Sequence, residues 1–501
     1  MRAAAFSIAL LTATVLVQAQ GRGGQQIPSG PQPTRTMPAP HFEYAGPVSA
    51  GRISAAAAVA GKPGVYYAGA ASGGVWKSID GGTTWKPTFD NESSQAIGAL
   101  AVSQSNPNTV WAGTGEGWAV RDMDMMGDGI YKSTDAGDTW TNVGLRDTGR
   151  IGTIGVHPTN DNVVLVCALG RVTGPQHERG VYRTEDGGKT WQQVLFVDEN
   201  TGCSGLQISQ KDPNLVLVGT WQMYLQTHVL ESGGPGSGIY LSRDGGKTFT
   251  KITDPGLPKP PYGKTDVAIA PSDPNRMYAL IQTGADGVQT WGSTTRMKSE
   301  AQGSLWRSDD GGKTWKNESW DRRLIGRAGY YIRVRVSPDN PDHLLLTNSS
   351  LWESNDGGKV FHNAQGCGDC HDIWWDTTPS MPGHYIVTGD GAMSIFGSPA
   401  NPNGATSVSL PIGQMYRVTV DQRYPYWLYS DRQDDGSMRF SSARPIVPAN
   451  VPSYVPAASS EGPAGGRGGR GGRGGGGGRG GRGAAEAEGP AQENMPSFES
   501  G

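Results

Sequence analysis

Short runs of apolar residues alternate with polar turns along most of the chain, in an order that repeats. One unit contains an apolar run at residues 151–156, a turn rich in Asn and Asp, and a second apolar run at 163–167. A variable loop then leads to a third run, a glycine-containing turn and a fourth run that opens with Trp or Phe. Runs of this length between Pro, Asn, Asp and Gly clusters predict antiparallel strands joined by tight turns. Each unit is therefore expected to form a four-stranded antiparallel sheet.

The turn before the fourth strand carries the clearest repeat in the chain. It reads SIDGGTTW at residues 78–85 and recurs five more times, at intervals of about 46 to 66 residues. A strand-rich unit that repeats at such an interval is typical of a β-propeller. Six copies of one catalytic acid would make no chemical sense, so we expect these carboxylates to be structural and to accept N–H bonds within their own turns. The repeated residues are Asp80, Asp135, Asp186, Asp244, Asp310 and Asp356.

A seventh unit, from Asp372 to about Pro411, keeps the strand pattern but lacks the aspartate turn. We therefore predict an all-β fold, a seven-bladed propeller with four-stranded antiparallel blades, over residues 42–411. Further strand-like runs follow from Met415. Residues 412–450 are predicted to form either a partial eighth blade or the start of a second propeller.

Composition changes sharply at both ends of the chain. An apolar run that ends in Val17-Gln18-Ala19 predicts a signal peptide over residues 1–19, and hence a secreted or periplasmic protein. Residues 20–41 read as a disordered leader, and the Gly/Arg-rich residues 451–501 as a disordered RGG-rich tail. The net charge of −3 argues against a nucleic-acid partner, and no later apolar run has the length of a membrane span.

The loops between second and third strands are the long and chemically varied ones, and alternating strand direction places them on the face opposite the aspartate turns. Long loops on one face of a rigid scaffold are where binding residues usually lie. Cationic and aromatic side chains around a central depression suit an acidic or carbohydrate-like ligand. The candidate ligand-binding residues are Arg52, Glu116, Trp118, Arg150, His177, Glu178, Arg327, His371 and Asp372.

The chain has four cysteines. Cys167 and Cys203 are expected either to pair between adjacent blades or to be buried apolar residues. Cys367, Cys370 and His371 match the C-x-x-C-H pattern of covalent haem attachment. The alternatives are a small disulfide loop or a reduced pair, and we expect no cofactor.

Three acids, Asp122, Asp124 and Asp128, lie close together in one loop and could coordinate a hard cation. Their spacing does not match the calcium-binding EF-hand loop. Solvation of the loop explains them better, so we expect no metal site.

Several motifs resemble the Asp-box (BNR) propellers of exported bacterial proteins related to the sortilin N-terminal domain. They are the six repeated turns, GTGE at residues 113–116, HDIWWD at 371–376, and the stretch from QMYRV to RQDDGS at 414–437. The resemblance runs from about Phe42 to Phe440. It implies a large propeller that presents a binding face, and it implies no established reaction.

Two enzyme families share the Asp box. Xyloglucanase-like glycosidases are similar, but the resemblance places a catalytic Asp in the first blade where this chain has Ala71 and Ser72. Sialidase-like propellers need an arginine cluster, which Arg52, Arg150 and Arg327 could imitate, but a matching Tyr/Glu nucleophile pair is not evident. Glycoside cleavage normally needs two carboxylates.

The sequence therefore favours an exported binding module that recognises an extracytoplasmic protein, peptide or glycan through its loop-rich face. The alternative is a glycoside hydrolase of the xyloglucanase-like or sialidase-like propeller type, in an active, an inactive or an incomplete form. A third alternative is a purely structural assembly module. The sequence does not determine the oligomeric state.

Overall fold

The computed structural model describes residues 51–120, 124–284, 289–290, 293–297, 299–413, 415–432 and 436–442. The predicted signal peptide at 1–19, the leader at 20–41 and the tail at 451–501 lie outside these described residues. Within the described ranges the helices are single turns, and none of them has the length and apolar character needed to cross a membrane.

The first three blades each consist of four consecutive antiparallel strands. Blade 1 contains β1 (Ile53–Ala58), β2 (Tyr66–Ala70), β3 (Val75–Ser78) and β4 (Lys86–Pro87). Blade 2 contains β5 (Ile97–Val102), β6 (Val110–Thr114), β7 (Ile130–Ser133) and β8 (Thr141–Asn142). The 3-10 turn η1 (Arg146–Thr148) leads into blade 3, with β9 (Ile151–Val156), β10 (Val164–Ala168), β11 (Gly180–Thr184) and β12 (Gln192–Leu195).

The last three blades repeat this order. Blade 5 contains β18 (Thr265–Ala270), β19 (Asp273–Ile281), β22 (Leu305–Ser308) and β23 (Lys316–Ser319). Two short helices, η2 (Arg322–Leu324) and α1 (Ala328–Tyr331), lead into blade 6, with β24 (Arg333–Val336), β25 (Leu344–Thr347), β26 (Ser350–Ser354) and β27 (His362–Gly368). Blade 7 contains β28 (Cys370–Trp375), β29 (Tyr385–Gly389), β30 (Met393–Ser398) and β31 (Asn401–Val408).

Blade 4 departs from the four-stranded pattern. Its core strands are β13 (Thr201–Ile208), β14 (Val216–Gln226), β16 (Gly238–Ser242) and β17 (Thr250–Lys251). Strand β14 runs past the end of β13, so its last residues pair instead with β15 (Val229–Ser232). Strand β15 then pairs in parallel with β21 (Ser293–Arg296), which itself pairs with β20 (Gln289–Thr290). The long loop of blade 5 is thereby joined to blade 4.

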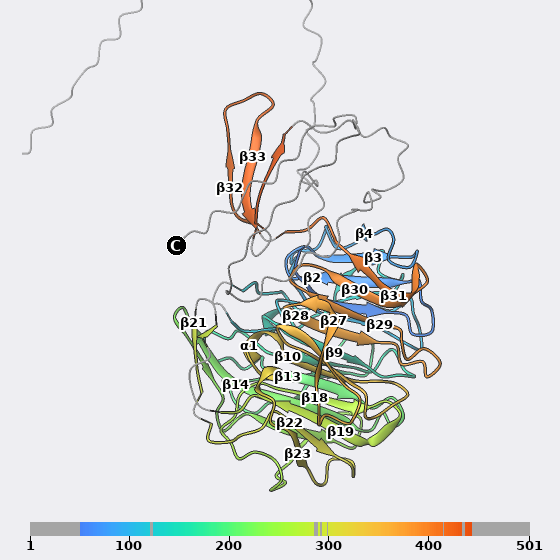
Figure 1. The fold of residues 1–501 in the computed structure, drawn as a ribbon, viewed down its shortest axis with the longest axis vertical. Coiled ribbons are helices and arrows are strands. Elements are labelled where there is room, and N and C mark those ends of the chain that lie inside the picture. Colours follow the sequence, from blue (N-terminus) through green and yellow to red (C-terminus); the bar gives the residue numbers. More distant parts are fainter. Residues whose placement is uncertain are drawn as a thin grey trace, which may run out of the picture. The chain divides into compact units, whose positions relative to one another are not determined.

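The innermost strands form a closed ring. Each contacts the next in the order β1, β5, β9, β13, β18, β24 and β28, and β28 contacts β1 again. In Figure 1 the blue strands of blade 1 accordingly lie beside the orange strands of blade 7. The seven-bladed all-β propeller predicted from the sequence is therefore confirmed.

Three further strands, β32 (Met415–Val420), β33 (Trp427–Arg432) and β34 (Gly436–Ser441), form a separate antiparallel sheet. They do not close the ring, because β1 packs directly against β28. Their assignment to a partial blade or to a second propeller remains a prediction.

The hydrophobic core is divided into layers between blades. One cluster of buried apolar side chains lies at each of the seven junctions between neighbouring blades. The aromatic residue that follows each box joins the layer shared with the preceding blade: Trp140 packs between blades 1 and 2, and Phe361 between blades 5 and 6. Burial of rings of this size is among the largest hydrophobic contributions in a fold. Each box therefore anchors its own blade to its neighbour.

The box aspartates are bound inside their own turns. Asp135 accepts hydrogen bonds from the Thr139 N–H (2.9 Å), the Thr139 hydroxyl (2.6 Å) and the Ser133 hydroxyl (2.7 Å). The bonds from Thr139 are the largest cause that lowers the pKa of Asp135 to about 2, and bonds from Thr314 do the same for Asp310. The equivalent backbone N–H bond occurs in all six boxes, and the Thr hydroxyl bond in the five that have Thr, since Val360 takes its place in the sixth. These carboxylates are engaged locally in six separate turns.

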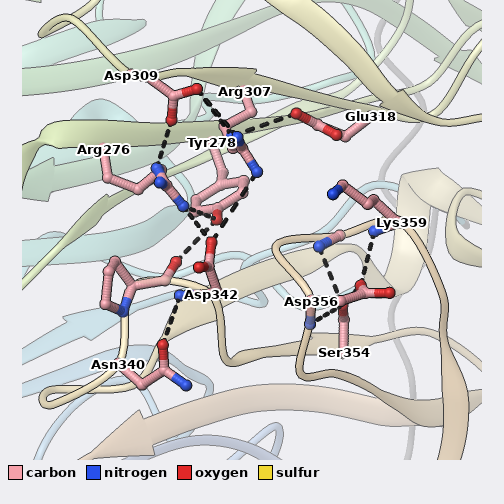
Figure 2. A network of polar contacts seen from close by, with 12 residues as sticks. Arg276, Tyr278, Arg307, Asp309, Glu318, Asn340, Asp342, Ser354, Asp356 and Lys359 are labelled. Carbon is pink, nitrogen blue, oxygen red and sulfur yellow. Dashed lines mark hydrogen bonds and ion pairs between the residues drawn. The ribbon is translucent and has the colours of Figure 1, made fainter.

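The box turns share one face with the turns between first and second strands. In six blades a backbone N–H of the box turn donates to a carbonyl of that first turn, as Gly311 does to Asn275 (3.0 Å). Figure 2 shows how this face joins blades 5 and 6: Arg276 contacts Asp309 of its own blade (2.5 Å) and Asp342 of the next. Tyr278 donates its hydroxyl to the Pro341 carbonyl (2.8 Å).

Polar contacts also join blade 7 to blade 1. Asp376, which is fully buried, accepts the backbone N–H of Gly61 (3.0 Å) and bonds the His384 ring (2.8 Å). The other ring nitrogen of His384 lies 2.9 Å from the Tyr66 hydroxyl. Ser398 donates to the carbonyl of Gly81 (2.6 Å). These side chains hold together the two ends of a ring whose first and last blades are far apart in sequence.

Candidate functional site

Six of the nine sequence-predicted residues gather at one end of the innermost strands, on the side where these strands begin. Arg52 and Arg150 immediately precede β1 and β9, and His371 is the second residue of β28. The loop after β6 brings Glu116 and Trp118, and the loop that contains α1 brings Arg327. We call these six residues, together with Tyr330, Tyr331, Asp369 and Asp390, the polar cluster.

His371 lies at the centre of the polar cluster. Its ring stacks on Trp118 at 4.5 Å between centroids and meets the Tyr330 ring edge-on at 5.0 Å. Its Nε2 lies 2.6 Å from Asp390 Oδ1, so Nε2 carries the proton opposite a carboxylate and Nδ1 is left as an acceptor. Burial lowers the pKa of His371 even though Asp390 opposes that shift. The imidazole is therefore neutral near neutral pH.

Asp390 is shared between His371 and Arg52. Arg52 donates from Nε (2.6 Å) and from Nη2 (3.1 Å), the bidentate geometry that binds carboxylates most strongly. Burial alone would raise the pKa of Asp390, but His371 and Arg52 outweigh it and hold that pKa well below its usual range. The Arg52 guanidinium also lies over the Trp118 and Tyr330 rings. Blade 1 and blade 7 are thus joined here by an ionised, buried pair.

Glu116 differs from Asp390 in its protonation state. Its side chain is 1% exposed, and burial raises its pKa to about 8, with Asp124 adding to the shift and Arg52 and Arg150 opposing it. The carboxyl group therefore carries a proton at neutral pH. Arg150 is equally buried and donates from Nη2 to the Asp124 carbonyl (2.6 Å).

Several buried polar atoms of the cluster have no hydrogen-bond partner among the described residues. Leaving such an atom unsatisfied costs about 1–3 kcal/mol, so their concentration in one place requires an explanation. Most are donors, and the acceptors are a carboxyl oxygen and an imidazole nitrogen. The atoms are Glu116 Oε2, Trp118 Nε1, Arg150 Nε, Arg327 Nε, Tyr331 Oη and His371 Nδ1.

The edge of the cluster that faces solvent carries backbone strain. Arg327 and Asp369 form an ion pair at 3.5 Å, and their side chains are 22% and 35% exposed. Both adopt left-handed backbone conformations, with φ of 52° and 46°, which are uncommon outside glycine. Strain of this kind concentrates at functional sites. Because both side chains are partly exposed, the Arg327–Asp369 pair is the part of the polar cluster that a ligand can reach from solvent.

Three predicted residues lie elsewhere. Asp372 is next to His371 in β28 and so points to the opposite face of the strand, where it lies 3.9 Å from Arg335. His177 is exposed and contacts Glu199 at 2.8 Å, and Glu178 is half-buried beside it. The structure therefore does not bring these three residues together with the other six, and their role in ligand binding stays a prediction.

Sequence reasoning missed Asp390, Asp369 and the two tyrosines. Asp390 lies in a Gly-Asp-Gly turn, and the Tyr330-Tyr331 pair directly follows the Gly-Arg-Ala-Gly stretch that contains Arg327. Both stretches could have been recognised in the sequence, because each places polar or aromatic residues shortly before a strand. Their contact with Arg52 and Trp118 depends on closure of the ring, which no local pattern encodes.

A separate cavity of about 220 Å³ is lined by residues of all seven innermost strands, toward the face that carries the box turns. Its wall includes Asp372 and Arg335, and Arg335 pairs with the buried Asp266 at 3.1 Å. Burial lowers the pKa of nearby Lys264 to about 7, Arg333 adds to the shift, and Asp266 opposes it. The polar cluster and this cavity are therefore two different features of the ring.

The cysteines form two disulfides. Cys167 and Cys203 join blades 3 and 4, which selects the first of the two alternatives predicted for them. Cys367 is bonded to Cys370, so both sulfurs that a covalent haem would need are engaged with each other. The His371 ring is packed between Trp118 and the tyrosines. These residues do not fit a haem.

Among the described residues, no group of three or more His, Cys, Asp or Glu side chains is arranged to hold a metal ion. Asp122 lies outside the described residues. Asp124 accepts the Val120 N–H (3.1 Å), and Asp128 accepts the Tyr131 hydroxyl (2.8 Å).

Comparison with known proteins supports the resemblance found in the sequence. Residues 73–220 and 128–257 match the Sortilin-Vps10 family model (sortilin, neurotensin receptor 3). A Paenibacillus xyloglucanase is 26% identical over 38% of this chain and 19% of its own length. A probable oligoxyloglucan-reducing end-specific xyloglucanase of Neosartorya fischeri is 26% identical over 46% of this chain and 28% of its own. The match thus spans less than a third of these relatives.

Two solved structures share the fold. The GH74 xyloglucanase of Xanthomonas campestris has a TM-score of 0.53 at 15% identity, covering 78% of this chain and 60% of that one. An ancestral GH74 enzyme has a TM-score of 0.52 at 17% identity, covering 81% and 55%. The chain is therefore a sortilin-like Asp-box propeller related to the xyloglucanases.

Proposed function

We propose that this sortilin-like propeller is an exported module that binds a glycan through the polar cluster. The choice of a glycan as ligand starts from the similarity of the chain to xyloglucanases. The observation that carries the proposal is the set of buried, unsatisfied donors and acceptors behind the Arg327–Asp369 pair. A sugar hydroxyl both donates and accepts, so one ligand can satisfy Arg327 and Tyr331 as well as Asp369. The aromatic rings of the cluster also suit the apolar face of a sugar.

Binding is favoured over cleavage by the state of the carboxyl groups. Where the family resemblance would put a catalytic acid, Ala71 is 2% exposed and packs against Trp118, Tyr330 and Tyr331. Asp390 is held by Arg52 and His371, and Glu116 is buried. Glycosidases normally place two carboxyl groups on either side of the scissile bond. Of these two carboxyl groups, Asp390 is engaged by protein side chains, and Glu116 is shielded from solvent.

The alternative is a glycoside hydrolase, and two observations favour it. The curated relatives are named as xyloglucanases. In addition, Glu116 is protonated while Asp390 is ionised, and carboxyl groups with pKa values driven apart are the usual acid and base of hydrolytic enzymes. Under this alternative Glu116 would be the general acid.

The test combines binding and turnover on the same material. Xyloglucan, its oligosaccharides and other soluble glycans are titrated by calorimetry, and release of reducing ends is measured in parallel. Arg327→Ala is expected to weaken glycan binding at least tenfold. The matched control is Arg323→Ala, which removes an exposed arginine paired with Asp321 in the same segment and should leave affinity unchanged.

Each outcome decides between the functions. Equal affinity of Arg327→Ala and wild type would overturn the polar cluster as the binding site, and binding of peptides in place of glycans would overturn the ligand class. Release of reducing ends that disappears in Glu116→Gln would establish the hydrolase alternative.

The buried acid also predicts a pH-dependent stability. Because the pKa of Glu116 is about 8 in the folded chain and about 4.3 when unfolded, the protein should lose stability as pH rises from about 4 to 8. Glu116→Gln removes this titration. In urea unfolding, the difference in stability between pH 5 and pH 8 should be smaller for Glu116→Gln than for wild type. An identical difference in both proteins would contradict the buried, protonated state.

A further inference from the structure

A second feature with binding character lies on blade 5, outside the polar cluster. A groove of about 680 Å³ runs between the segment 256–261, residues 300–302 and the end of β23. This volume is within the range of small-ligand sites, roughly 300–1,000 Å³. None of its lining residues belongs to the polar cluster or to the central cavity.

Trp320 lines one side of this groove and is 65% exposed. It directly follows β23, whose strand pairing ends at Ser319. In contrast, Trp306 at the same groove is 2% exposed and packs in the layer between blades 4 and 5. Trp306 therefore has a structural role, whereas Trp320 presents its indole ring to solvent beside a concave surface.

Asn317 lines the groove and is the unusual polar residue of this region. Both amide atoms, Nδ2 and Oδ1, are buried and have no hydrogen-bond partner among the described residues. Asn317 stands opposite Trp306 in the strand pair, and a Cβ at Gly303 would lie 2.1 Å from its Nδ2. The amide therefore fits only because residue 303 is glycine. Burying two amide atoms without partners is unfavourable, so a ligand that pairs with them would be stabilised there.

The remaining lining residues define the chemistry of a ligand. Gln302, Glu300 and Lys259 are exposed and add an amide, a carboxylate and an ammonium group to the lining. Pro258, Pro260 and Pro261 add apolar surface to it. A side-chain amide places a donor next to an acceptor, which matches two adjacent hydroxyls of a sugar ring. An exposed indole provides a flat surface for the ring's apolar face.

We propose that the groove at Trp320 and Asn317 is a carbohydrate-binding site for a neutral oligosaccharide, separate from the polar cluster. The ligand stacks on Trp320, and its hydroxyls pair with the Asn317 amide and with Gln302. This site does not require the polar cluster to bind, so the two proposals stand or fall separately. A proline-rich peptide could contact the same aromatic and apolar surfaces. Its binding would depend less than that of a sugar on hydrogen bonds to the side-chain amides of Asn317 and Gln302.

In the experiment the full chain is titrated with cellotetraose and with xyloglucan oligosaccharides. Calorimetry and tryptophan fluorescence measure binding. Trp320→Ala and Gln302→Ala are each expected to weaken binding, the first at least tenfold. Gln302 is exposed, so its variant tests the site without disturbing the fold. Trp320→Phe should remove the part of the fluorescence change that arises from the exposed indole, and the buried Trp306 remains in this variant. The control is Tyr426→Ala, which removes an aromatic residue that is 45% exposed and lies immediately before β33.

The results separate this site from the polar cluster. A tenfold or larger loss of affinity caused by Trp320→Ala in the Arg327→Ala background, where the polar cluster no longer contributes, supports the groove. Wild-type affinity in Trp320→Ala and Gln302→Ala, no measurable binding of any neutral oligosaccharide, or capture of a proline-rich peptide in preference to the glycans would each overturn it.

Discussion

Replacing Asp390 with alanine is expected to lower the free energy of unfolding by about 3–5 kcal/mol. Asp390 is the shared acceptor of Arg52 and His371, and its removal takes away the carboxylate that binds the buried Arg52 guanidinium through two hydrogen bonds. Arg52 and Asp390 are separated by 338 residues and belong to the first and last blades. The loss therefore falls on the contact that closes the ring. Urea unfolding monitored by tryptophan fluorescence measures it.

The matched control for Asp390 is Asp138→Ala. Asp138 also forms an ion pair across blades, with Lys77 at 3.0 Å, but its side chain is 56% exposed. Exposed pairs contribute about 0–1 kcal/mol, so this variant should unfold close to wild type. A cost below about 1 kcal/mol for Asp390→Ala would show that the buried pair does not hold the ring closed.

Removing the Cys167–Cys203 disulfide is expected to cause the second large loss of stability. The bond closes a sequence separation of 36 residues and joins blades 3 and 4. The chain-entropy model then gives a stabilisation of about 4 kcal/mol. The double variant Cys167→Ala/Cys203→Ala is expected to lose about this much in urea unfolding. Wild-type protein treated with a reductant should shift in the same direction.

The second disulfide supplies the control. Cys367 and Cys370 are only three residues apart, so the same model assigns their bond about 1.5 kcal/mol. The double variant Cys367→Ala/Cys370→Ala should therefore lose clearly less. Equal losses of unfolding free energy in the two double variants would contradict the explanation that each disulfide stabilises the fold according to the length of the loop it closes.

The blades were predictable because their information is local. A box such as 78–85 contains the aspartate, the glycines and the aromatic residue that together form one turn and one anchor. The repeat of that unit predicts six blades, and the strand pattern from Asp372 to Pro411 predicts the seventh. The extension of blade 4 was not predictable, since the length of β14 beyond its partner became visible only once β15 and β21 lay beside it.

The polar cluster was predicted in part for a related reason. Arg52, Arg150 and Arg327 each precede an innermost strand, and this shared position in the repeat places them at the same end of the ring. Asp372 was misplaced by the alternation of side chains in β28, where it faces away from His371. A shift of one residue along a strand reverses the face on which a side chain lies.

The amino-acid sequence by itself determined the blades, their number and the face on which the box turns lie, because the alternation of strands and turns and the hydrogen bonds within each of the six boxes are local properties of the chain. Only the tertiary structure decided which charged groups meet, which cysteines pair and where polar atoms are left unsatisfied. Those properties depend on distances between residues such as Arg52 and Asp390, and closure of the ring alone brings these together.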